Sequence, residues 1–151
     1  MAEPDARPGA SDRLGRARGD PIHHHDLCFG CGQANLFGLQ LELEPSADGG
    51  VEGRFFVKQD HQGPPGYAHG GVMAAALDEA MALLLFERGT FAVTGRLEVE
   101  LVAPAPVGTF VRVSARLEEE GERTLELAAE ATGEAGERLA AARGTFVRRS
   151  P

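Results

Sequence analysis

The fold of this chain is decided by residues 61–86, which read HQGPPGYAHGGVMAAALDEAMALLLF. Glycine and proline crowd the first half, so residues 61–71 are predicted to form an ordered loop. The remainder is apolar apart from Asp78 and Glu79, which predicts a buried helix over Val72–Phe86. The first turn of a helix carries free N–H groups and the positive end of the helix dipole. Donors fixed in this way can stabilise an oxyanion such as a polarised thioester carbonyl.

Helical spacing divides the predicted helix into two faces. Asp78 lies two turns after Gly71 and shares a face with small residues, namely Ala74, Ala75 and Ala82. The bulky residues lie on another side, which is predicted to pack on a sheet: Met73, Leu77, Met81 and Leu84. Glu79 projects about 100° away from Asp78. We interpret Glu79 as a solvated or structural acid, and an ion pair with an arginine is an alternative structural role for Asp78.

The distance between Gly70 and Asp78 bears on how many chains build a site. Eight residues separate them, which is about 12 Å along a helix axis, too far for both to contact one carbonyl group. If they act on one substrate, two chains must supply them. An antiparallel pairing of two such helices across a symmetric dimer would bring Asp78 of one chain towards Gly70 of the other.

The rest of the chain reads as β-structure. Leu39, Leu41 and Leu43 alternate with polar residues, a turn follows at residues 45–50, and Val51–Val57 returns as the second strand of a hairpin. Four more strands are predicted after the helix: Phe91–Val102, Thr109–Glu118, Thr124–Ala131 and Arg138–Arg148. The pattern predicts an α+β fold in which an antiparallel sheet wraps around one long central helix.

These motifs resemble a known family. His69-Gly70-Gly71, followed by Leu77-Asp78-Glu79-Ala80 and then a β-rich half, looks like the PaaI-type acyl-CoA thioesterases of the hotdog superfamily. The resemblance covers roughly residues 26–149. It implies the hotdog fold and hydrolysis of an acyl-CoA thioester to the free acid and coenzyme A, without a cofactor or metal.

The resemblance also implies a role for individual residues. The backbone N–H of Gly70 would polarise the thioester carbonyl, and His69 would help to place it. Asp78 would come from the neighbouring subunit as nucleophile or general base. Thr94, ten residues before Pro104, matches a hydroxyl position of the family and would position the carboxylate or the nucleophilic water.

Two further residues are expected to contact the substrate. Gln62 is the nearest match to a polar amide that family members carry in the loop before the histidine, and it is one residue out of register. Gly71 lets a ligand approach the first helical turn closely.

Two other functions fit the same motifs. A catalytically idle hotdog protein that binds acyl-CoA would keep Gly70 and the pocket without needing Asp78. Hydration of enoyl thioesters would use an acid and a histidine on one substrate carbon, and the spacing of His69 and Asp78 fits thioester hydrolysis better.

Composition narrows the partners and the domain organisation. A length of 151 residues suits one domain, so we expect a mobile extension over residues 1–25 and a hotdog domain over residues 26–151. A single core of this size favours a homodimer or homotetramer. The net charge of −8 and the dispersed basic residues argue against nucleic acid as a partner. No long apolar run or signal-peptide pattern is present in this sequence, so we expect a cytoplasmic protein without a membrane partner.

A second motif lies before the first predicted strand. Cys28-Phe29-Gly30-Cys31-Gly32 follows three histidines, His23 to His25, and two thiolates with imidazoles can form a zinc site. The second cysteine pair of a common zinc motif is missing. We therefore interpret the segment as a tight glycine-rich turn and expect no metal. Similar segments precede the first strand in some hotdog thioesterases, with Asn35 and Gly38 also matching.

Overall fold

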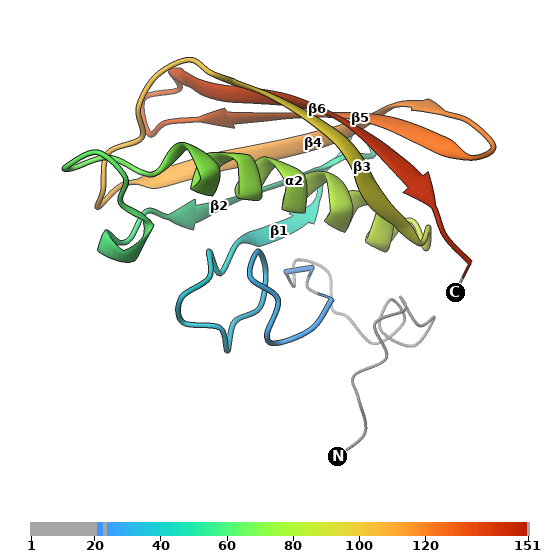
Figure 1. Cartoon of the computed structure of the whole chain (residues 1–151), viewed down its shortest axis with the longest axis horizontal. Coiled ribbons are helices and arrows are strands. Elements are labelled where there is room, and N and C mark those ends of the chain that lie inside the picture. The colour runs from blue at the N-terminus through green and yellow to red at the C-terminus, as the bar shows by residue number, and fades with distance from the viewer. Residues whose placement is uncertain (1–20, 23, 151) are drawn as a thin grey trace.

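The computed structural model describes residues 21, 22 and 24–150, which form one antiparallel sheet with a long helix along one face (Figure 1). The elements are β1 (Glu42–Pro45), β2 (Val51–Phe56), the 3-10 helix η1 (Gln59–His61), α2 (Gly70–Glu87), β3 (Ala92–Leu101), β4 (Phe110–Glu120), β5 (Thr124–Thr132) and β6 (Arg138–Arg148). The six strands lie in the order β1-β2-β4-β5-β6-β3. The predicted α+β arrangement, with a sheet wrapped around one helix, is confirmed.

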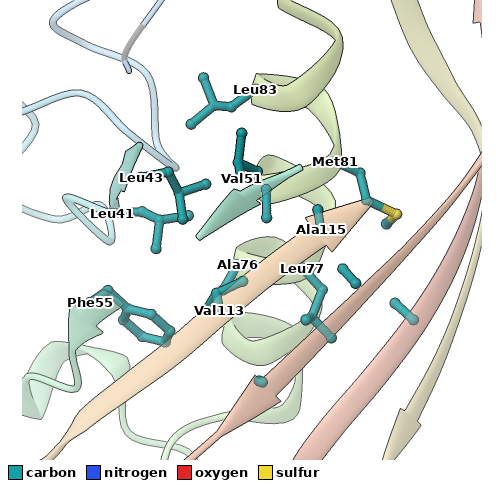
Figure 2. Close-up of a cluster of buried hydrophobic side chains, with 14 of the residues drawn as sticks. Leu41, Leu43, Val51, Phe55, Ala76, Leu77, Met81, Leu83, Val113 and Ala115 are labelled. Atoms are coloured by element: carbon teal, nitrogen blue, oxygen red, sulfur yellow. The ribbon is translucent and has the colours of Figure 1, made fainter. Parts of the chain in front are cut away.

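The core lies between α2 and the concave face of the sheet. Inward residues of the strands are buried and their neighbours are exposed, as in β4, where Val113 and Ala115 flank the exposed Ser114. Figure 2 shows Leu77 and Met81 of α2 directed towards these strands. Small residues in the strands let the helix approach, and a Cβ atom at Gly144 would lie only 3.0 Å from Cε of Met81.

Strand β1 is shorter than the leucine alternation predicts. Leu39, Leu41 and Leu43 are all buried, as expected, yet the strand begins only at Glu42. The reason is Gln40, whose φ of 50° lies in the left-handed region and interrupts extended backbone. The Gln40 side chain donates to the carbonyl of Gln33 at 2.9 Å.

The packed part of the chain begins earlier than the expected boundary at residue 26. Ile22 is fully buried, and its N–H donates to the carbonyl of Leu43 at 2.6 Å. Ile22 thus belongs to the core and not to the expected extension. The remainder of that expected extension, residues 1–20 and His23, lies outside the described residues.

The loop before α2 is ordered, as predicted, and is built around His61. The imidazole of His61 is buried, accepts the N–H of Lys58 at Nδ1 and lies 3.0 Å from the carbonyl oxygen of Gly38 at Nε2. A carbonyl only accepts, so Nε2 carries the proton. The carbonyl of His61 in turn accepts the N–H of His69 at 2.8 Å and fixes the start of the helix.

The two edges of the sheet differ. The edge formed by β1 is short and is partly covered by the bridge between Ile22 and Leu43. At the other edge β3 has 10 residues and pairs only with β6 within the described part of the chain. Val93 and Leu101 of β3 are 40% and 57% exposed. A long open edge with exposed apolar residues is a surface on which another strand can pair.

Candidate functional site

The first turn of α2 presents one free backbone donor. His69 is the N-cap residue, and its Nδ1 accepts the N–H of Gly71 at 2.8 Å. The carbonyl of His69 accepts the N–H groups of Val72 and Met73 at 2.9 and 3.3 Å. Among the described residues, the N–H of Gly70 has no acceptor, so it is the group of this turn that is left for a ligand.

The two glycines of this turn contribute differently. A Cβ atom at Gly70 would lie 2.8 Å from Cδ1 of Leu101, the exposed leucine at the end of β3. A Cβ atom at Gly71 would lie 3.0 Å from Nδ1 of His69. The N–H of Gly71 already donates to Nδ1 of His69. Gly71 can therefore contribute to substrate binding only by leaving room for the substrate.

Asp78 lies on the small-residue face of α2 and is held by a strand. The hydroxyl of Thr94 in β3 donates to Oδ1 of Asp78 at 2.6 Å. Asp78 is half-buried, as are Ala74, Ala75 and Ala82 on the same face, whereas the bulky face is buried on the sheet. The two predicted helix faces are confirmed. The partner of Asp78 is the hydroxyl of Thr94, and not the arginine considered as an alternative.

A β-bulge sets the position of Thr94. Thr94 pairs with Phe146 and Arg96 pairs with Thr145, so Gly95 is an extra residue without a partner in β6. A bulge bends the strand locally and redirects the neighbouring side chains. A Cβ atom at Gly95 would lie 3.0 Å from Cγ2 of Val147, so a glycine suits this position.

Gln62 is exposed, and its side-chain oxygen accepts the N–H of Gly66 at 2.5 Å. It therefore organises the loop that precedes His69. The structure brings Asp78 and Thr94 together, and it brings His69, Gly70 and Gly71 together. Gly71 of one group and Asp78 of the other lie two turns apart on α2.

A second cluster of chemically active side chains lies beside the same helix. One possible ligand atom from each of His24, Cys28, Cys31 and Glu79 lies within 4.8 Å of the others. The Glu79 side chain is only 13% exposed. Of the two interpretations of Glu79 from the sequence, a solvated acid is therefore wrong and a structural acid remains. The reason is that the Cys28–Cys31 turn packs over it.

The cluster perturbs the ionisation of its members. Burial raises the pKa of the Glu79 carboxyl to about 7. A hydrogen bond with Cys31 lowers the pKa of the Cys28 thiol, and that hydrogen bond together with burial raises the pKa of Cys31. A hydrogen bond with Cys28 raises the pKa of His24. The four groups therefore influence one another's protonation through hydrogen bonds and charge.

Residues 65–140, which contain the α2 N-terminus, Asp78 and Thr94, match the model of the thioesterase superfamily. The chain belongs to this superfamily. The match begins in the loop before His69 and runs into β6, so it includes every residue of the Asp78 face. The antiparallel sheet around one helix is thus the hotdog fold that the sequence predicts.

Solved structures extend the similarity to most of the chain. A thioesterase superfamily protein is 26% identical with a TM-score of 0.76, and the match covers 81% of this chain but 60% of that protein. The PaaI protein of E. coli, from the phenylacetic acid degradation operon, is 20% identical with a TM-score of 0.70, covering 78% of this chain and 87% of PaaI.

A hypothetical thioesterase protein of Streptococcus pneumoniae, solved with coenzyme A, is 21% identical with a TM-score of 0.67, covering 73% of this chain and 88% of that protein. Variants of that protein with one threonine or one aspartate replaced by alanine are also similar. No curated protein matches the sequence. In the described part of the chain, no helix is both long and apolar enough to cross a membrane.

Proposed function

We propose that the protein hydrolyses an acyl-CoA thioester to the free acid and coenzyme A. The observation that carries the proposal is the half-exposed Asp78 carboxylate, held by Thr94 on the small-residue face of α2. Membership of the thioesterase superfamily supports the reaction type, and the similar protein solved with coenzyme A supports the ligand.

Each group has a role in the proposed reaction. The N–H of Gly70 donates to the thioester oxygen and stabilises the negative charge that develops there. Asp78 either attacks the carbonyl carbon, giving a mixed anhydride that water then hydrolyses to the free acid, or removes a proton from a water that attacks the carbonyl directly. In both cases the carbon–sulfur bond breaks, and the coenzyme A thiolate takes up the proton released by the water. Thr94 holds the carboxylate through one oxygen and leaves the other available. His69 keeps the N–H of Gly71 occupied and so shapes the turn around Gly70.

The pairing of Asp78 with Thr94 has a parallel in a similar protein. In the Streptococcus pneumoniae protein, the replaced threonine and aspartate are separated by the same spacing of 16 residues as Thr94 and Asp78. This parallel supports a joint role for the two side chains in the present chain.

The site is proposed to form between two chains. Gly70 and Asp78 lie about 12 Å apart along one helix, so one chain cannot place both on one carbonyl. The open edge of β3 offers a pairing surface for a second copy, and Leu101 on that edge lies beside Gly70. A symmetric pair would contain two sites, each with Gly70 from one chain and Asp78 from the other.

The direct test is release of free thiol from a panel of acyl-CoA esters by the purified protein. Turnover with at least one ester, with no turnover of the matching enoyl hydration reaction, is the expected result. Tight binding of acyl-CoA without any thiol release would instead support a binding protein.

Subunit complementation tests the shared site. Asp78→Asn removes the acid, and Gly70→Pro removes the donor N–H. The backbone here accepts proline because Gly70 is the first residue of α2 and His69 before it is extended, with ψ of 138°. The added Cβ atom would lie 2.8 Å from Cδ1 of Leu101, the end of an exposed side chain that must move aside, so circular dichroism and mass are checked for this variant first. Each variant alone is expected to be inactive, and exchanged heterodimers should regain activity at one of their two sites. Heterodimers verified by mass that stay inactive would contradict a shared site.

A further inference from the structure

We propose that His24, Cys28, Cys31 and Glu79 bind one zinc ion that ties the N-terminal segment to α2. Three contacts already join the four side chains. Nδ1 of His24 lies 3.3 Å from Sγ of Cys31 and 3.3 Å from Oε1 of Glu79, and Sγ of Cys28 lies 3.4 Å from the same Oε1.

These separations match the edges of a tetrahedral zinc site. Zinc binds sulfur at about 2.3 Å and nitrogen or oxygen at about 2.0–2.2 Å, so neighbouring ligand atoms in a tetrahedron lie about 3.3–3.8 Å apart. All the candidate ligand atoms lie within 4.8 Å of one another. Small side-chain movements are therefore enough to bring them to a common ion.

The backbone of the cysteine turn is shaped for this arrangement. The N–H of Gly32 donates to the carbonyl of Cys28 at 2.9 Å and closes the turn. A Cβ atom at Gly32 would lie 2.3 Å from the carbonyl oxygen of Asp26, so a side chain cannot be accommodated there. Cys28 and Cys31 are thereby held on the side of the turn that faces the helix.

Gly30 provides the space through which Glu79 reaches the cysteines. A Cβ atom at Gly30 would lie 2.3 Å from Cγ of Glu79. The carboxylate therefore enters the cluster across a residue without a side chain. A helix acid that only faced solvent would not need this close approach.

The donor set favours zinc and a structural role. Two cysteines, one histidine and one carboxylate give four protein ligands, which is a closed tetrahedral set with no position for substrate. Cys31 is fully buried, and the side chains of His24 and Glu79 are 26% and 13% exposed. This inference does not rest on the proposed hydrolase activity, because Asp78 projects about 100° away from Glu79.

The inference departs from the absence of metal expected from the sequence. No metal was expected because the sequence has one cysteine pair and lacks the second pair of a common zinc motif. The fourth ligand instead comes from α2, 48 residues after Cys31 in the sequence, and a carboxylate replaces a cysteine.

Metal analysis of the full chain, without an affinity tag and under reducing conditions, tests the proposal. We expect about one zinc per chain after dialysis. Co²⁺ added to the stripped protein should give the visible bands of a tetrahedral ion together with sulfur-to-metal charge transfer. Removing the zinc should lower the melting temperature, and adding Zn²⁺ should restore it.

Matched variants separate this site from adventitious binding by neighbouring histidines. His24→Gln and Glu79→Gln should each weaken Zn²⁺ binding at least tenfold, as should Cys31→Ser. His25→Gln is the control, because the Nδ1 of His25 accepts the nearby N–H of Leu27 and His25 is not one of the four clustered residues. Circular dichroism checks the fold of each variant.

The result that would overturn the proposal is a wild-type protein that takes up far less than one Zn²⁺ per chain. Co²⁺ spectra without sulfur charge transfer would also overturn it, and this measurement needs no variant. Equal loss of binding in His24→Gln and His25→Gln would mean an adventitious histidine site.

Discussion

Asp78 and Glu79 are neighbours in the sequence, yet their side chains meet different surroundings. Asp78 accepts a hydrogen bond from Thr94 on the sheet side of the small-residue face, whereas Glu79 is enclosed by the N-terminal cysteine turn. One turn of α2 thus carries the acid of the proposed reaction and the acid of the proposed metal site. Separate substitutions can therefore test the two roles.

Asp78→Asn keeps the size and the hydrogen-bonding capacity of the side chain but removes the base or nucleophile. We expect turnover of acyl-CoA to fall at least ~10²-fold while the melting temperature changes little. Glu44→Gln is the control, since Glu44 is an exposed acid of β1 on the other edge of the sheet. Nearly normal thiol release by Asp78→Asn would refute the proposed role.

Thr94→Val removes the hydroxyl that holds the Asp78 carboxylate and preserves the shape of the side chain. A hydrogen bond to a charged group contributes about 1.5–3 kcal/mol, so kcat should fall at least about tenfold with a smaller change in KM. Thr94→Ser should restore most of the rate because it retains the donor. If serine and valine gave equal rates, the hydroxyl would not position Asp78.

At the level of elements, α2 depends on its buried face. Leu77 is fully buried between helix and sheet, so Leu77→Ala should lower the free energy of unfolding by about 2–5 kcal/mol. Leu27→Ala makes the same chemical change at a side chain that is 68% exposed, and it should alter stability by less than about 0.5 kcal/mol. Urea unfolding of both variants checks the difference, and equal losses would contradict the assigned faces.

Sequence periodicity predicted these elements because it reports burial. Five of the six strands overlap their predicted ranges closely, and the helix differs from its prediction only at the ends. The exception, β1, is shortened by the left-handed conformation of Gln40, which alternation of leucines cannot reveal. The helix faces followed from spacing alone for the same reason.

The contacts between distant segments were not predictable in this way. The family resemblance, and not periodicity, predicted that Thr94 would position the Asp78 carboxylate. The contact depends on the bulge at Gly95, and a glycine inside a strand is the local sign of such a bulge, although it does not name the residue that the strand then meets. The approach of Glu79 to the cysteines depends on packing between the N-terminal turn and the helix. The glycine at position 30 was the available signal, because it marks a close approach, although it does not name the residue that approaches.

At the scale of the whole molecule, the described residues leave the sheet with one protected edge and one open edge. The short β1 edge is bridged by Ile22, and the 10 residues of β3 lie at the other end of the strand order. The residues of the proposed reaction, Asp78 and Thr94, lie on the side of the molecule where β3 is open. A second copy paired there would complete the proposed site and cover the exposed Val93 and Leu101.

The open edge of β3 makes catalysis depend on how much protein is present. If a site needs residues of two chains, then below the dissociation constant of the dimer the rate should follow mass action, and doubling the protein should raise the rate about fourfold rather than twofold. Initial rates over a dilution series, compared with sedimentation at the same concentrations, measure this dependence. A rate that stays proportional to protein where only single chains sediment would mean that one chain catalyses alone.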